Sequence, residues 1–306
     1  MAKSRKRRAA HRYRPPASRV RAALLHGKKQ ARAALERRPP RTGEEAAGNN
    51  GLLIAEGDSW FDYPFYDVLE ELEQEFDYDV ESVAHLGDTV EEMAYDTAQL
   101  SKLASKFQKI GGQGRKPRAI LLSGGGNDIA GNEFAIFLNH KSSGLAPLND
   151  RIVAGVLEDR LSFAVMSLIG AVTELSRKYF GVVTPVLLHG YDYPVPDGRG
   201  YLGGFWVLPG PWLEPGFRQK GYADLQERCQ IMVEFIDRFN ELLAAIARRP
   251  ELPQVTHVDL RGTLSNDLAG NKYKKSWGNE LHPTEGGFTE VARKINAAIK
   301  PFPIPQ

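Results

Sequence analysis

Short apolar runs alternate along this chain with longer stretches of helical periodicity, and this alternation restricts the fold more than any other feature. The candidate strands are the largely apolar runs 52–55, 119–122 and 182–188 and the more polar segments 79–84 and 255–258. The stretches with apolar residues at every third or fourth position are 90–107, 152–175, 225–246 and 283–298. Runs of this length favour buried strands, and strands that alternate with helices form one parallel sheet with helices on both faces. The pattern therefore predicts a single α/β domain over residues 51–306.

Charge divides the chain near residue 50. Residues 1–50 contain 15 Lys or Arg and 3 Asp or Glu, whereas the whole chain of 306 residues has a net charge of only +2. Such a basic, proline-rich stretch cannot build a core, so we expect residues 1–50 to be a disordered tail with at most a transient helix over 18–38. Three interpretations of the tail stay open. It is a solvated linker, a segment that binds nucleic acid or an anionic membrane surface, or an organelle transit peptide.

Several classes of protein are excluded by what the sequence contains. The single cysteine, Cys229, rules out an intrachain disulfide framework and a cysteine metal site. The seven histidines are scattered and form no His-x-x-x-His pair that would suggest a metal site. No apolar run approaches the roughly 18 residues of a membrane span, and none near the start is long enough for a signal peptide. We therefore expect a cytoplasmic protein without a metal or cofactor.

Glycines and polar residues follow the predicted strands at the sheet edge where ligands bind, beyond the carboxyl ends of the strands. The first run is followed by Gly57-Asp58-Ser59, the second by Gly87, the third by Gly126-Asn127-Asp128, and the fifth, at some distance, by His282-Pro283. A hydroxyl nucleophile, two donors for an oxyanion and an imidazole base would thus meet at one edge. Each element alone is weak evidence, because Gly-Asp-Ser is often a simple turn. The prediction of a catalytic site depends on their order and placement together.

In this order and spacing, the four blocks resemble those of the SGNH (GDSL) hydrolase family. The resemblance covers residues 51–300, essentially the whole body of the chain. It implies a flavodoxin-like three-layer α/β/α sandwich with a central five-stranded parallel sheet, which matches the alternation of strands and helices. It also implies hydrolysis of esters and thioesters, with substrates in the family that range from acyl-lipids to acetylated sugars.

The resemblance also implies a role for each residue of the blocks. Ser59 would attack the acyl carbonyl, and His282 would take the serine proton and return it to the leaving alcohol. The backbone N–H groups of Ser59 and Gly87 and the side-chain amide of Asn127 would form the oxyanion hole. One such donor is typically worth about 10²–10³ in rate. The chemistry implied is that of a serine esterase that uses no cofactor.

Asn279 departs from the family pattern, which usually has Asp three residues before the histidine. That Asp orients the imidazole, and its replacement by Asn in a His-based triad can lower the rate by about 10⁴ through the wrong tautomer. Three interpretations stay open. The Asn279 carbonyl oxygen accepts the ring N–H, or a carboxylate such as Asp192 or Glu280 replaces the acid, or the centre is a dyad or degenerate.

Aromatic residues are concentrated in the irregular segment 191–221 and directly after the nucleophile, where Trp60, Phe61, Tyr63 and Phe65 follow. They either pack a long loop onto the body or form the wall of an apolar acyl pocket, which would favour acyl or aryl esters. The sequence thus predicts a carboxylesterase-like or lipase-like serine hydrolase. The alternative is a catalytically inactive protein of the same fold whose basic tail binds nucleic acid or an anionic surface.

Overall fold

A parallel sheet forms the centre of the computed structural model, which describes residues 16–35, 50–131, 133–201 and 209–305. Its five strands within these ranges are β1 (Leu52–Glu56), β2 (Asp79–Ser82), β3 (Ala119–Leu122), β4 (Val186–His189) and β5 (Val255–Val258). They lie in the order β2-β1-β3-β4-β5, and every pairing is parallel. The strand order reverses between β1 and β3, so the sheet has its switch point beside the carboxyl end of β1.

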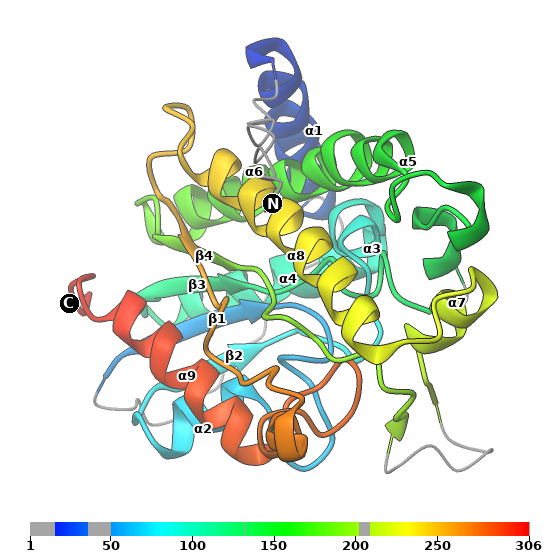
Figure 1. Ribbon diagram of the computed structural model, residues 1–306. Helices are drawn as coiled ribbons and strands as arrows, with labels where there is room; N and C mark the ends of the chain where they lie inside the picture. Colours follow the sequence, from blue (N-terminus) through cyan, green and yellow to red (C-terminus); the bar gives the residue numbers. More distant parts are fainter. Residues whose placement is uncertain (1–15, 36–49, 132, 202–208, 306) are drawn as a thin grey trace.

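Helices cover both faces of the sheet (Figure 1). One face carries α2 (Val68–Gln74) and α9 (Glu285–Ile299), and the other carries α3 (Val90–Tyr95), α4 (Thr97–Gly112), α6 (Ser162–Phe180) and α8 (Leu225–Ala247). Right-handed crossovers require this division. The chain crosses the sheet toward one edge from β1 to β2 and toward the opposite edge from β2 to β5, so the connecting helices lie on opposite faces. The predicted three-layer α/β/α sandwich is therefore confirmed.

The burial of each strand follows its place in the sheet. All residues of the central strands β1, β3 and β4 are buried, whereas the edge strands β2 and β5 are buried only in part. A central parallel strand is covered by helices on both faces and is therefore apolar along its length. The polar exceptions are His189 at the end of β4 and Glu56 at the end of β1. The Oε1 atom of Glu56 accepts from the Gln99 side chain at 2.9 Å. Burial raises the pKa of Glu56 to about 8.

Two of the predicted helices are interrupted. The stretch 90–107 breaks at Asp96, whose carboxylate accepts from two backbone N–H groups at the start of α4 and so begins a new helix. The stretch 152–175 covers the end of α5 (Asp150–Ala154), the π-helical segment η3 (Gly155–Leu161) and most of α6. The short helices α2 and α7 (Glu214–Gln219) were not predicted, because fewer than three turns leave little periodicity. Within the described residues, 3₁₀ helices are η1 (Phe134–Phe137), η2 (Lys141–Ser143) and η5 (Ala269–Lys275).

Part of the basic stretch 1–50 is a packed helix, which differs from the expected disordered tail. Ala17–Leu35 form α1, which lies across α6 and α4 outside the three layers (Figure 1). Val20 and Ala23 are fully buried, and the absence of a Cβ at Gly27 allows close approach to the backbone of Ser167 in α6. Small and apolar residues thus recur at helical spacing between the basic ones.

Residues 1–15 and 36–49 lie outside the described residues. The proposed contacts of the basic stretch with nucleic acid or an anionic membrane surface therefore stay predictions. In the part of the chain that the structure describes, no helix combines the length and the apolar content that a membrane span requires.

Candidate active site

Ser59 lies in the turn that follows β1, at the switch point of the sheet. The preceding Asp58 is buried and fixes the shape of this turn. Its carboxylate accepts from the backbone N–H of Trp60 at 3.1 Å, from the Ser123 hydroxyl at 2.8 Å and from the Tyr191 hydroxyl. Three donors hold one buried carboxylate in place. Asp58 therefore positions the turn that presents Ser59.

His282 lies in the loop between η5 and α9 and reaches Ser59 from the far end of the chain. The Nε2 atom of His282 is 2.8 Å from the Oγ atom of Ser59, and the two residues are 223 positions apart. This is the distance expected between a nucleophile and its general base. Trp60 joins the two loops, because its indole N–H donates to the carbonyl oxygen of Leu281 at 3.0 Å. The structure thus brings together the serine and histidine that the sequence placed at one edge.

Asn279 lies beside the other ring nitrogen of His282. Its Oδ1 atom is 3.0 Å from Nδ1 of the ring and accepts from the backbone N–H groups of Leu281 and His282, each at 2.9 Å. Because backbone N–H groups can only donate, these two bonds turn the carbonyl oxygen, not the amide nitrogen, toward the ring. Nδ1 therefore carries the proton, and the lone pair of Nε2 faces Ser59.

Glu280 does not take the place of the missing acid. It is fully buried, and its carboxylate accepts from four backbone N–H groups at 2.7–3.1 Å. These donors belong to Gly198, Trp212, Leu213 and Glu214. The prediction that Glu280 orients His282 is wrong, because every one of these bonds anchors the long segment after β4. Burial raises the pKa of this carboxyl, and the four donors oppose the shift.

Asp192 is also used elsewhere. Its fully buried carboxylate accepts from three backbone N–H groups, those of Tyr193, Gly262 and Leu264. These bonds join the end of β4 to the loop after β5. Among the described residues, no hydrogen bond or ion pair links Asp192 to His282, so the prediction of Asp192 as the alternative acid is wrong as well. Of the three interpretations, the one in which the Asn279 carbonyl oxygen accepts the ring N–H agrees with the structure.

Aromatic rings surround His282, which is only 5% exposed. The ring of Tyr63 stacks on the imidazole with 4.2 Å between centroids, and the ring of Trp212 meets it at 5.6 Å and nearly at right angles. Burial disfavours the charged imidazolium and lowers the pKa of His282 to about 3. The histidine is therefore neutral in water near pH 7, which is the form that a general base needs.

Gly87 and Asn127 are the two further candidates for the oxyanion hole. Gly87 has a φ of +96°, a conformation that glycine adopts without strain. The Nδ2 atom of Asn127 donates to the carbonyl oxygen of Asp88, next to Gly87, at 3.0 Å. An amide nitrogen has two N–H groups, so one bond holds the side chain while the other N–H can meet a ligand. Asp128 ties the same loop to α3 by accepting from the backbone N–H of Val90 at 2.9 Å.

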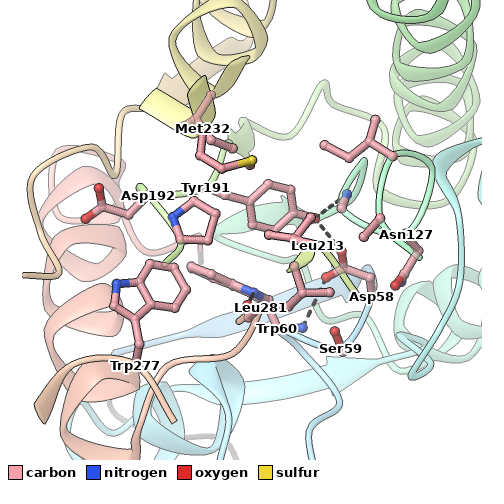
Figure 2. Close-up of a pocket in the computed structure, with 15 residues that line it drawn as sticks. Asp58, Ser59, Trp60, Asn127, Tyr191, Asp192, Leu213, Met232, Trp277 and Leu281 are labelled. Carbon is pink, nitrogen blue, oxygen red and sulfur yellow. Dashed lines mark hydrogen bonds between the residues drawn. The ribbon is translucent and has the colours of Figure 1, made fainter. Parts of the chain in front are cut away.

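A small apolar pocket with a cavity volume of about 40 Å³ opens beside Ser59. Figure 2 shows Ser59 and Asn127 on one side of it and Asp192 and Trp277 on the opposite side. The remaining lining residues are Asp58, Trp60, Gly126, Ile129, Ala130, Tyr191, Pro194, Leu213, Met232, Ile236 and Leu281. The pocket therefore begins at the predicted nucleophile and oxyanion donor and continues into apolar side chains.

The aromatic residues of segment 191–221 have separate roles. Phe217 is fully buried and packs on Phe134 at 5.0 Å between centroids, as in the packing interpretation. Trp212 lies against His282, and Tyr201 lies 5.9 Å from the ring of Tyr63. Phe205 and Trp206 lie outside the described residues.

Two contacts of the site were not predicted from the sequence. The hydroxyl of Tyr63 accepts from Nδ2 of Asn279 at 3.0 Å, across 216 positions of the chain, and Tyr191 donates to Asp58 across 133 positions. The sequence marks Tyr63 only as one of several aromatic residues after the nucleophile. No local pattern indicates which of them turns toward the histidine loop.

Comparison with known proteins connects the chain to one family. The model of the GDSL-like Lipase/Acylhydrolase family matches residues 47–295. Among solved structures, the chain is similar to a GDSL-like lipase from Bacteroides thetaiotaomicron, with 12% identity over 91% of this chain and 98% of that chain and a TM-score of 0.42. It is also similar to a catalytic mutant of an acetylxylan esterase from Geobacillus stearothermophilus, with 14% identity over 84% of this chain and 96% of that chain and a TM-score of 0.41.

No curated protein matches the chain, so the family assignment rests on the family model. That model covers the sheet, its helices and all four sequence blocks. The resemblance found in the sequence is thereby confirmed: the chain belongs to the GDSL-like lipase/acylhydrolase family and is a hydrolase that acts on ester bonds.

Proposed function

We propose that this hydrolase is a serine esterase in which Ser59 is the nucleophile, His282 the proton carrier and Asn279 the residue that orients the imidazole. The observation that carries the proposal is the 2.8 Å contact between Oγ of Ser59 and Nε2 of His282. It is supported by the 3.0 Å contact between Oδ1 of Asn279 and Nδ1 of the same ring, which selects the tautomer that can accept a proton from serine.

The reaction begins when the Ser59 oxygen bonds to the ester carbonyl carbon and its proton passes to Nε2 of His282. Negative charge then develops on the former carbonyl oxygen. The backbone N–H groups of Ser59 and Gly87 and the amide of Asn127 stabilise this charge. The bond to the alcohol oxygen breaks, and this oxygen takes the proton from Nε2.

Water completes the cycle by attacking the acyl group on Ser59. It gives one proton to Nε2 of His282 as its oxygen bonds to the acyl carbon. The bond between this carbon and the serine oxygen then breaks, and the proton returns to the serine. The products are a carboxylic acid and an alcohol, and the enzyme regains its starting state.

The size of the pocket supports a short acyl group. A buried water requires at least about 10–15 Å³ of cavity volume, so about 40 Å³ accepts about three to four heavy atoms. Side chains such as Ile129, Leu213 and Ile236 suit an alkyl chain. We expect kcat/KM for p-nitrophenyl esters to be highest from acetate to butyrate and to fall at octanoate. A preference for octanoate would contradict this part of the proposal.

Covalent labelling tests the nucleophile. A serine-directed fluorophosphonate should label the wild-type protein once, and Ser59→Ala should abolish both the label and the hydrolysis of p-nitrophenyl acetate. Ser105→Ala removes a hydroxyl from α4, where it donates to the carbonyl oxygen of Ser101, and should leave both signals unchanged. A wild-type protein that is folded but neither labelled nor active would favour the inactive alternative and contradict the proposal.

A further inference from the structure

Tyr63 contacts both His282 and Asn279. Its ring lies over the imidazole with 4.2 Å between centroids and 22° between planes. Its hydroxyl oxygen accepts from Nδ2 of Asn279 at 3.0 Å. One side chain thus touches the proposed base and the residue that orients it, and neither the family match nor the sequence blocks assign it a role.

The need for such a residue follows from the charge that develops on His282. Each time the imidazole accepts the serine proton it becomes a cation, and in a triad with Asp a carboxylate stabilises that cation. Asn279 supplies only an amide oxygen. Asp58 and Glu280 are the buried carboxylates next to Ser59 and His282 in the sequence. Each accepts from donors other than the imidazole, among them the Ser123 hydroxyl and the backbone N–H of Leu213. The imidazolium must therefore be stabilised by neutral neighbours.

We propose that Tyr63 is a positioning residue that compensates for the missing carboxylate: its hydroxyl holds Asn279, and its ring face stabilises the cationic form of His282. The face of an aromatic ring attracts a cation, and the attraction is stronger where water is excluded. His282 is 5% exposed and Asn279 2%, so water cannot provide this stabilisation. The inference rests on the proposed role of His282 as the base.

The two contacts of Tyr63 differ in importance. The Asn279 oxygen stays held by the backbone N–H groups of Leu281 and His282 even without the tyrosine hydroxyl. Tyr63→Phe therefore removes one bond to the amide nitrogen but keeps the ring over the imidazole. Tyr63→Leu removes the ring as well. We expect the second substitution to affect catalysis more than the first.

The experiment measures kcat and KM for p-nitrophenyl acetate in Tyr63→Phe and Tyr63→Leu, each with Asn279 and with Asn279→Asp. With Asn279 in place, Tyr63→Leu should lower kcat by about 3- to 30-fold, which is the range that corresponds to the free energy of a cation–π contact. Tyr63→Phe keeps the ring, so its kcat should be close to that of the wild type. With Asn279→Asp, the same Leu substitution should change kcat by less than about 3-fold, because the carboxylate then stabilises the cation.

A matched control separates this effect from packing. Tyr66 is also partly buried and packs on Tyr63 and Phe288 at 5.9 Å between centroids, but no ring contact joins it to His282 among the described residues. Tyr66→Leu should therefore leave kcat within about 2-fold of wild type. The proposal would be overturned if Tyr63→Leu and Tyr66→Leu lowered kcat equally. It would also be overturned if Tyr63→Leu lowered kcat by the same factor with Asn279 and with Asn279→Asp.

A second series keeps the shape of the ring and changes only its electrostatics. Phenylalanine and its mono-, di- and trifluoro analogues at position 63 progressively weaken the negative face of the ring, so kcat should fall stepwise along the series. A constant kcat would overturn the proposal even if Tyr63→Leu failed to fold. Fluorophosphonate labelling of wild-type Ser59 is measured in parallel. Its absence would refute the serine mechanism itself, whereas normal labelling with a flat series would refute only the role of Tyr63.

Discussion

Replacing Asn279 by Asp should move the acid limb of the pH–rate profile. The substitution places a carboxylate oxygen where the amide oxygen now lies 3.0 Å from Nδ1 of His282. Two unit charges about 4 Å apart attract by about 4 kcal/mol at an effective dielectric constant of about 20, which equals about three pKa units. Burial lowers the pKa of His282 to about 3 in the wild type. An opposite charge favours the charged form, so in Asn279→Asp this pKa should rise to about 6.

The assay is kcat/KM for p-nitrophenyl acetate from acid to neutral pH, with folding checked by circular dichroism at each pH. Only the neutral imidazole accepts the serine proton, so the rate falls as the pH drops through the pKa of His282 in the free enzyme. The wild type should keep its plateau to about pH 4, whereas Asn279→Asp should lose activity below about pH 6. At pH 8, the variant should equal or exceed the wild type, because the carboxylate stabilises the imidazolium.

Asn271→Asp is the control, because it adds the same charge at an exposed position in η5. It should leave the acid limb where the wild type has it. The reasoning is refuted if Asn279→Asp and the wild type share one acid limb, since Asn279 would then not face the imidazole. A wild-type limb near 6.5, the ordinary value for histidine, would refute the effect of burial.

Two further predictions concern the contacts that hold the site and the outer helix. Glu280→Gln puts an amide nitrogen against backbone N–H donors and should destabilise the fold by about 1–3 kcal/mol for each donor left unsatisfied, seen as a lower Tm. Glu241→Gln on the exposed side of α8 should leave Tm unchanged, and equal Tm values would contradict the anchoring role. Gly27→Val should undock α1, because a Cβ there would lie 1.7 Å from the carbonyl oxygen of Ser167. In Gly27→Val, Tm should fall while fluorophosphonate labelling of Ser59 persists. The control Ala22→Val, at an exposed position of α1, should leave Tm unchanged. An unchanged Tm in Gly27→Val would show that α1 does not pack on α6 at this position.

The fold and the main catalytic candidates could be predicted because their signals are local. The run 119–122 coincides with β3, and the run 52–55 covers all of β1 except its last residue, since a buried parallel strand is apolar at successive positions. Ser59 and His282 could be placed at one edge because each follows a strand or precedes the last helix. The break at Asp96 was missed, because helical periodicity continues through a residue that ends one helix and caps the next.

The contacts of the carboxylates could not be predicted in the same way. Glu280 lies just before His282 in the sequence and Asp192 follows β4, yet both accept from backbone N–H groups of loops. Which donors a buried carboxylate meets depends on the path of each loop in space. The alternatives that were open in the sequence could therefore be decided only by the structure.

The sequence by itself determined the alternation of strands and helices, the family and the order of the four blocks, because hydrophobic periodicity and short motifs are properties of neighbouring residues. The tertiary structure decided that Asn279 faces the imidazole, that Tyr63 lies over it and that α1 packs on α6 despite its basic composition. The contacts of Tyr63 and of α1 join residues that are far apart in the chain, and the contact of Asn279 depends on how its own loop turns. Their geometry exists only once the sheet has brought its loops to one edge and its helices to one face.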